Sequence, residues 1–201
     1  MYQAIVFFPL LGALIAGLFG RIIGDRPSEL ISSGLLILSA LMSCIAFVDV
    51  GLNGEAVAVN VLQWIHSGSL HIDWVLRIDT LTAVMLVVVT CVSSMVHVYS
   101  IGYMSHDPAR PRFFAYLSLF TFMMLMLVTA DNFVQLFFGW EGVGLASYLL
   151  IGFWYKKPSA NAAAIKAFVV NRVGDFGLIL GMSAIYFTVG SLEFDTVFAA
   201  A

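Results

Sequence analysis

The fold class follows from the stretch at residues 133–153, FVQLFFGWEGVGLASYLLIGF, which contains a single charged residue, Glu141. A helix needs about 20 predominantly apolar residues to cross a bilayer. This stretch therefore predicts a membrane-spanning helix with one carboxyl group near its middle.

The composition of the whole chain agrees with a membrane protein. Hydrophobic residues make up 61% of the 201 residues and charged residues only 10%, with a mean hydropathy of +0.99. An ordinary soluble domain has about 25% charged residues. This shortfall excludes a soluble globular domain, a disordered chain and a nucleic-acid-binding protein. The net charge of -3 also predicts no basic patch for phosphate or anionic lipid.

Six apolar stretches are long enough to span a membrane, at about residues 3–23, 30–50, 80–101, 113–129, 133–153 and 164–189. All of them must be helical, because an isolated chain has no other way to satisfy its backbone polar groups in lipid. We therefore expect an all-α integral membrane protein that forms a single transmembrane domain over residues 1–201. The polar tail at 191–198 indicates a short surface helix.

The positions of lysine and arginine predict an orientation. Cytoplasmic loops are enriched in these residues. The first, third and fifth connections, with the start of the sixth span, contain Arg21, Arg26, Arg110, Arg112, Lys156, Lys157 and Lys166, whereas the opposite side has only Arg77. We therefore expect the N-terminus and the connection between spans two and three on the outer side.

The long second connection predicts a β-hairpin at about 56–78 on the outer membrane face. Two partly alternating, β-branched segments flank a polar turn that contains glycine. We expect Trp64 and Trp74 at headgroup depth, and Asp79 as the N-cap of the third span. His66, His71 and Asp73 are too sparse a set to predict a metal site.

Three charged residues lie inside predicted spans, where ionisable groups usually mark an ion pathway. Glu141 is flanked by Gly139, Gly142 and Gly144 and is our candidate proton acceptor and donor. Arg172 and Asp175 are three residues apart, which places them on one helix face, where they can pair. A purely structural role in helix packing is the alternative for each of these residues.

Two further residues are possible proton relays. His97 lies near the inner end of the third span and exchanges protons near neutral pH. Lys166 lies at the inner mouth of the sixth span, where it could equally extend to the surface. No phosphate-binding loop or cysteine cluster is present, so we expect no redox cofactor or metal in this chain. Cys44 and Cys91 are expected to be small buried side chains.

Two motifs resemble the antiporter-like subunits of respiratory complex I. They are FGWEGVGLASYLLIGFW at 138–154 and AIKAFVVNRVGDFG at 164–177, and FFPLLG at 7–12 and DTLT at 79–82 also fit. The similarity covers essentially the whole chain and is greatest to the distal subunit type, called L or chain 5. It implies that these six helices are the N-terminal part of a larger bundle with two inverted repeats.

The resemblance also implies a function. In this family a membrane glutamate, matched here by Glu141, works in proton translocation with a lysine on a later helix, and Arg172 and Asp175 match a charged pair. The complex couples electron transfer from NADH to quinone to proton pumping. FMN, iron–sulfur clusters and quinone would belong to partner subunits, and the chain would contact a neighbouring antiporter-like subunit and lipids. The location would be the bacterial inner membrane, or the mitochondrial inner membrane for an organellar protein.

Two alternatives remain open at this point. The chain could belong to a multi-subunit sodium/proton antiporter, which shares this helix pattern. It could also be a structural membrane scaffold, in which case neutralising Glu141 would change assembly or nothing, but not transport.

Overall fold

The computed structural model describes residues 1–68 and 70–201. Six helices in this part of the chain are long and apolar enough to cross a membrane, as the sequence predicted. The elements are α1 (Tyr2–Ile23), α2 (Asp25–Ala46) with a π-helical extension η1 (Phe47–Leu52), β1 (Val57–Ser67), β2 (Leu70–Ile78), α3 (Thr80–Tyr103), α4 (Arg110–Val128), α5 (Phe133–Ile151), α6 (Pro158–Val189) and α7 (Phe194–Ala200).

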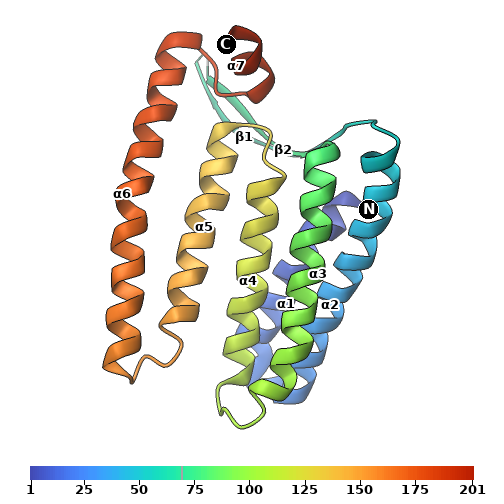
Figure 1. Ribbon diagram of the computed structural model, residues 1–201, viewed down its shortest axis with the longest axis vertical. Helices are drawn as coiled ribbons and strands as arrows, with labels where there is room; N and C mark the ends of the chain where they lie inside the picture. The colour runs from blue at the N-terminus through green and yellow to red at the C-terminus, as the bar shows by residue number, and fades with distance from the viewer. Residues whose placement is uncertain (69) are drawn as a thin grey trace.

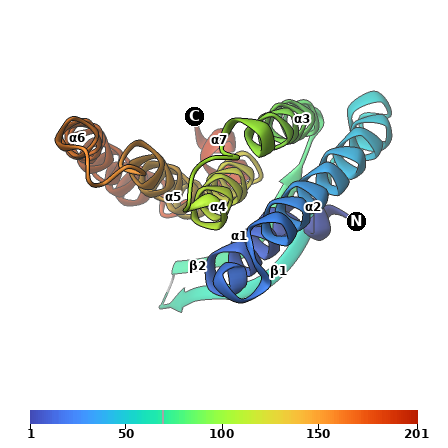
Figure 2. The same cartoon turned by 90° about the horizontal axis from the view of Figure 1, so that it is seen from below.

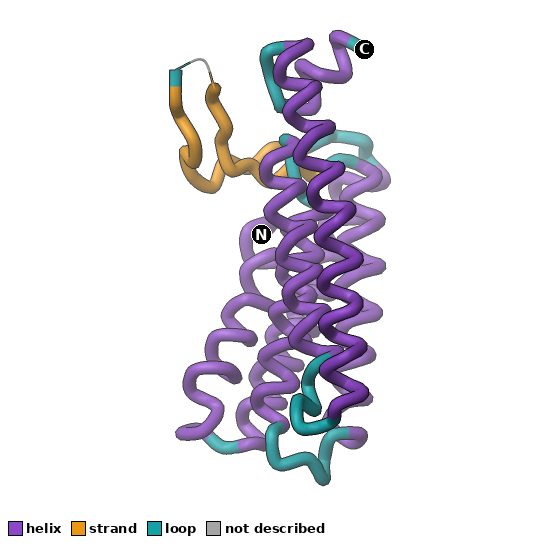
Figure 3. The backbone as a smooth tube through the Cα atoms, turned by 90° about the vertical axis from the view of Figure 1, so that its left-hand side faces the viewer, coloured by secondary structure: helices purple, strands orange, loops and turns teal. Residues whose placement is uncertain are grey.

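The six long helices run side by side, and the chain alternates between two ends of the bundle (Figure 1). We call the end that carries the N-terminus, the β1–β2 hairpin and α7 the hairpin end, and the opposite end the basic end. Seen along the bundle, α4 lies between α5 and α3, and α6 is outermost (Figure 2). The hairpin projects sideways from its end of the bundle (Figure 3). Consecutive connections therefore lie at opposite ends, as the expected topology requires.

A tight turn joins α1 to α2. Gly24 occupies this turn with a φ of 94°, a conformation that side-chain-bearing residues rarely adopt. The second helix begins at Asp25, earlier than the apolar run at 30–50 indicates. Pro27 lies in the first turn of α2, where its missing N–H has no helical partner to lose. Asp25 also accepts a hydrogen bond from Arg110 at 2.9 Å, which connects this turn to α4.

The hairpin predicted at 56–78 is present as an antiparallel pair of strands with Val57 opposite Ile78. Strand β2 docks on the turn between α4 and α5. The backbone N–H of Arg77 donates to the carbonyl of Thr129 at 2.9 Å, and the Asn132 side chain donates to the carbonyl of Asp73 at 3.0 Å. The hairpin is thus a packed part of the fold.

The main hydrophobic core lies near the hairpin end. It joins α1, α3 and α4 to strand β2, and its fully buried members include Ile5, Leu76, Ile78, Leu86 and Leu125. As predicted, Asp79 caps α3, because its side chain accepts the N–H of Thr82 at 2.8 Å.

The last long helix, α6, is the least covered by the described residues. Its only buried residues there are Ala164 and Asp175, and its main neighbour is α5. The prediction that both cysteines are buried is wrong for the described residues, because Cys44 is exposed and Cys91 is partly exposed. The two thiols lie beside each other on the neighbouring helices α2 and α3.

Candidate functional site

The candidate site lies where α5 faces α6. Arg172 on α6 donates from Nη1 to both carboxylate oxygens of Glu141 on α5, at 2.5 and 2.6 Å. The same nitrogen lies 3.5 Å from a carboxylate oxygen of Asp175. The sequence indicated that Arg172 can pair with Asp175. The structure contains this contact, but its distance is longer than that between Arg172 and Glu141. The residue that Arg172 binds most closely is Glu141, on the neighbouring helix.

Asp175 is held by a second side chain from α5. The indole Nε1 of Trp140 donates to Oδ1 of Asp175 at 2.8 Å, and Asp175 is only 5% exposed. Trp140 and Glu141 are neighbours in the chain, so α5 contacts both ends of the Arg172–Asp175 pair. We did not single out Trp140 from the sequence, although its position beside the only membrane glutamate of that helix was a usable signal.

The charges of this cluster do not balance. Two carboxylates share one guanidinium, so the cluster has a net charge of about -1 when all three groups are ionised. The Arg172 guanidinium also lies over the ring of Phe168, 4.7 Å from its centroid.

A cavity of about 370 Å³ adjoins the cluster. Its walls come from α4, α5 and α6 and are formed by Phe120, Leu127, Trp140, Glu141, Val143, Gly144, Ser147, Phe168, Asn171, Arg172 and Asp175. This volume is large enough for several water molecules, and polar groups that could hold them come from the cluster and from Ser147 and Asn171.

Close packing of α4 against α5 supports the site from behind. A Cβ added to Gly139 would lie 2.6 Å from the backbone of Leu127, and one added to Gly142 would collide with Met123. Position 139 therefore requires glycine, as expected for a close helix–helix contact in a membrane, whereas a larger residue at 142 requires the Met123 side chain to move.

The two predicted relay residues do not join this cluster. Lys166 lies on α6, is exposed, and forms no hydrogen bond or ion pair with the residues that the structure describes. His97 is fully buried on α3, which lies on the far side of α4 (Figure 2). Its ring nitrogens contact the carbonyl of Ser93 at 2.8 Å and the hydroxyl of Ser118 at 3.0 Å.

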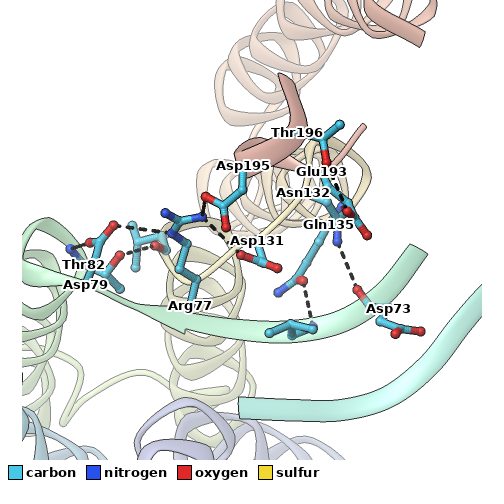
Figure 4. Close-up of polar contacts among 12 residues, drawn as sticks. Asp73, Arg77, Asp79, Thr82, Asp131, Asn132, Gln135, Glu193, Asp195 and Thr196 are labelled. Atoms are coloured by element: carbon cyan, nitrogen blue, oxygen red, sulfur yellow. Dashed lines mark hydrogen bonds and ion pairs between the residues drawn. The ribbon is translucent and has the colours of Figure 1, made fainter. Parts of the chain in front are cut away.

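A second charged cluster surrounds Arg77 at the hairpin end (Figure 4). The guanidinium contacts Asp195 of α7 at 2.7 Å, Asp131 at 3.5 Å and Asp79 at 3.6 Å. Burial raises the pKa of Asp131, while the charge of Arg77 lowers it and the charge of Asp195 raises it; the net pKa lies above the usual value. The sequence predicted Asp79 only as a helix cap and gave no sign of the arginine that it shares with Asp131 and Asp195.

The histidines of the hairpin form a local contact. His66 Nε2 lies 2.8 Å from a carboxylate oxygen of Asp73, and the Nδ1 atoms of His66 and His71 are 3.4 Å apart. Over residues 1–68 and 70–201, no three histidine, cysteine or acidic side chains come together in a metal-binding arrangement.

Two family models match the sequence. Residues 64–114 match the N-terminal segment of chain 5 of NADH-ubiquinone oxidoreductase (complex I), and residues 130–201 match the transmembrane segment of NADH:quinone oxidoreductase and Mrp antiporters. Together the two matches cover more than half of the chain and include both clusters.

Relatives match over the full chain. It is 56% identical to NADH-quinone oxidoreductase subunit L of Rhodobacter capsulatus, with 100% of this chain and 29% of the relative aligned. It is 53% identical to NADH-ubiquinone oxidoreductase chain 5 of Marchantia polymorpha, with 100% and 30% aligned. The chain thus spans less than a third of these relatives.

Solved structures share the fold. The membrane-bound sulfane sulfur reductase, an archaeal respiratory membrane complex, contains a chain that matches 98% of this one with a TM-score of 0.84 and 20% identity, over 39% of its own length. The Mrp complex of Dietzia sp. DQ12-45-1b matches 98% with a TM-score of 0.81 and 22% identity, over 20% of its own length. From its sequence matches and its fold, the chain belongs to the family of antiporter-like membrane subunits that includes complex I chain 5, also called subunit L.

Proposed function

We propose that this chain contributes a proton-binding site to a proton-translocating membrane subunit of NADH:quinone oxidoreductase. The observation that supports the proposal is the cluster of Glu141, Arg172 and Asp175 beside a cavity of about 370 Å³. The assignment to NADH:quinone oxidoreductase in this proposal comes from the names of the relatives. Electron transfer, FMN, iron–sulfur clusters and quinone belong to partner subunits in this proposal, together with a neighbouring antiporter-like subunit.

The proposed mechanism is a change in the contact between Glu141 and Arg172. While the two side chains are in contact, the positive charge of the Arg172 guanidinium offsets the negative charge of the Glu141 carboxylate. The balance of positive and negative charge around Glu141 changes when Arg172 withdraws or when another cation approaches Asp175. In the proposed mechanism, Glu141 takes up or releases a proton in response to this change. Moving one charge against 100 mV requires about 2.3 kcal/mol, and a charge–charge contact that alters proton affinity about fifty-fold supplies that order of energy.

The test is Glu141→Gln in the full-length subunit of the assembled complex. NADH-driven proton uptake and the quinone reductase rate are both measured in inverted membrane vesicles. We expect fewer protons per electron, because glutamine cannot exchange a proton. Glu193→Gln is the matched control, since it makes the same chemical change at an exposed position of the hairpin end. Unchanged proton uptake in an assembled Glu141→Gln complex would refute the proposed site.

A sodium/proton antiporter subunit is the second candidate, because one family model and one structural neighbour are named for Mrp. The two candidate functions differ in the driving force for proton movement. Proton movement should follow NADH oxidation in a complex I subunit, and an imposed sodium gradient in an Mrp-type antiporter. If neutralising Glu141 changed only the amount of assembled complex, the structural scaffold would be the better description.

A further inference from the structure

A second cavity, of about 600 Å³, lies at the basic end, between α1 and the start of α4. It is separate from the Glu141 cluster and plays no part in the proposed proton site. Its walls are formed by Ala16, Gly17, Leu18, Gly20, Arg21, Gly24, Asp25, Pro108, Ala109, Pro111, Arg112, Ala115 and Tyr116.

Two arginines in this wall have no carboxylate partner. Arg21 is exposed and forms no hydrogen bond or ion pair with the described residues. Arg112 donates from Nη2 to the carbonyl of Phe153 at 3.0 Å, and its Nε is buried without a hydrogen-bond partner among the same residues. The one carboxylate in the wall, Asp25, is already bound by Arg110 at 2.9 Å. The Arg112 guanidinium also lies over the rings of Phe153 and Tyr155. The cavity therefore has an excess of positive charge, and its exposed guanidinium is that of Arg21.

The rest of the wall is small and apolar. Gly17 lies against Ala115, because a Cβ added to the glycine would lie 3.4 Å from the Ala115 Cβ. At Gly20 the two helices are closer still, and an added Cβ would be 2.5 Å from the Cβ of Pro111. Gly17 and Leu18 are exposed beside these contacts, so the wall presents a small apolar face next to the arginines.

We propose that this cavity binds an anionic phospholipid at the basic end of the bundle. Arginine matches phosphate well, because its planar fork can donate two parallel hydrogen bonds to phosphate oxygens. Arg21 and Arg112 contact the phosphate, and an acyl chain lies on the small apolar face of α1 and α4. A free phosphate ion would use the same arginines but would have no use for the apolar face.

This proposal contradicts the prediction that was based on the composition of the chain. A net charge of -3 predicted no basic patch for anionic lipid. Three of the acidic residues, Asp79, Asp131 and Asp195, surround Arg77 at the hairpin end, whereas Asp25 and Glu29 at the basic end are paired with Arg110. Net charge averages over both ends of the molecule, whereas a lipid headgroup responds to the charges within about 10 Å of it.

The test uses the full-length subunit in its assembled complex, placed in phosphatidylcholine nanodiscs with a minor fraction of phosphatidylglycerol. Native mass spectrometry measures the phosphatidylglycerol that stays bound. We expect Arg21→Gln to retain roughly fivefold less, because a basic side chain near an anionic headgroup contributes about that factor. Arg21→Lys should show a smaller loss, since it keeps the charge and the fold but lacks the planar fork.

Arg26→Gln is the matched control. Arg26 lies in the same turn region, is exposed, and is absent from the cavity wall, so its loss should leave lipid retention unchanged. Equal losses from Arg21→Gln and Arg26→Gln would show a diffuse surface attraction and overturn the proposal. Unchanged retention in Arg21→Gln would overturn it as well. If inorganic phosphate displaced the lipid as effectively as added phosphatidylglycerol, the ligand would be free phosphate and the lipid assignment would be wrong.

Discussion

Arg172 on α6 donates to both carboxylate oxygens of Glu141 on α5, and this contact joins the two helices together with the hydrogen bond from Trp140 to Asp175. It gives the membrane glutamate a cationic partner within this chain. Any movement of α6 relative to α5 therefore changes the charge environment of Glu141.

A double-mutant cycle on Glu141→Gln and Arg172→Gln should show that the two side chains are coupled. Residues in direct contact typically have interaction energies of about 0.5–3 kcal/mol. We expect the double variant to lose less stability than the two single losses added together, because each single variant leaves an unpaired charge. Thermal unfolding of the detergent-solubilised full-length subunit measures this. Strictly additive losses would mean that the pair is not formed.

Trp140→Phe should destabilise the protein by about 1.5–3 kcal/mol. The change keeps the aromatic bulk but removes the N–H that donates to the buried carboxylate of Asp175 at 2.8 Å. Trp154→Phe is the control, because its Nε1 donates to Asp107 at an exposed site at 3.0 Å. Equilibrium unfolding should rank Trp140→Phe well below Trp154→Phe in stability; the reverse order would contradict the role of Trp140.

Gly139→Ala should destabilise the packing of α4 on α5 by about 1–3 kcal/mol, since its Cβ would lie 2.6 Å from the Leu127 backbone. Gly181→Ala on α6 is the control, because no atom lies within 4 Å of the added Cβ among the described residues. The control should be neutral or slightly stabilising, because alanine favours a helix. A neutral Gly139→Ala in the same unfolding assay would show that the two helices can separate freely.

Asp131→Asn should stabilise the protein modestly at neutral pH. Because the pKa of Asp131 is raised in the folded state, its stabilising contribution is complete below about pH 4 and is lost as the pH rises through the folded pKa. Asparagine resembles the protonated acid, so the variant should gain less than about 1 kcal/mol at pH 7 and nothing near pH 4. Melting temperatures at both pH values measure this.

Asp195→Asn is the control for the same cluster. It weakens the 2.7 Å contact with Arg77 and should therefore be mildly destabilising at pH 7, opposite in sign to Asp131→Asn. A destabilised Asp131→Asn variant at neutral pH would mean that attraction to Arg77 outweighs the burial of the Asp131 carboxyl group.

The orientation predicted from the lysines and arginines is also testable. In a cysteine-free background, Asn53→Cys at the hairpin end and Lys157→Cys at the basic end are exposed to a membrane-impermeant thiol reagent in intact cells. We expect labelling of position 53 only, because basic loops stay on the cytoplasmic side. Labelling of position 157 alone would show that the predicted orientation is wrong and that the basic end lies on the outer side.

The sequence by itself determined the architecture. Apolar runs of spanning length predicted six membrane helices, and the alternating segments around the polar turn at 66–69 predicted the hairpin between α2 and α3. These features are local, because the bilayer thickness and backbone hydrogen bonding act on each segment separately. The sequence also singled out Glu141, Arg172 and Asp175, because charged residues stand out in an apolar segment.

Only the tertiary structure decided which of these groups meet. The i,i+3 spacing brought Arg172 to Asp175, but the approach of α6 to α5 brought it closer to Glu141 and added Trp140. His97 stayed apart, since α4 separates its helix from the cluster. The three carboxylates around Arg77 come from distant parts of the chain. Which charged side chains contact one another depends on how the helices pack together. The residue pattern within a single segment cannot predict this packing.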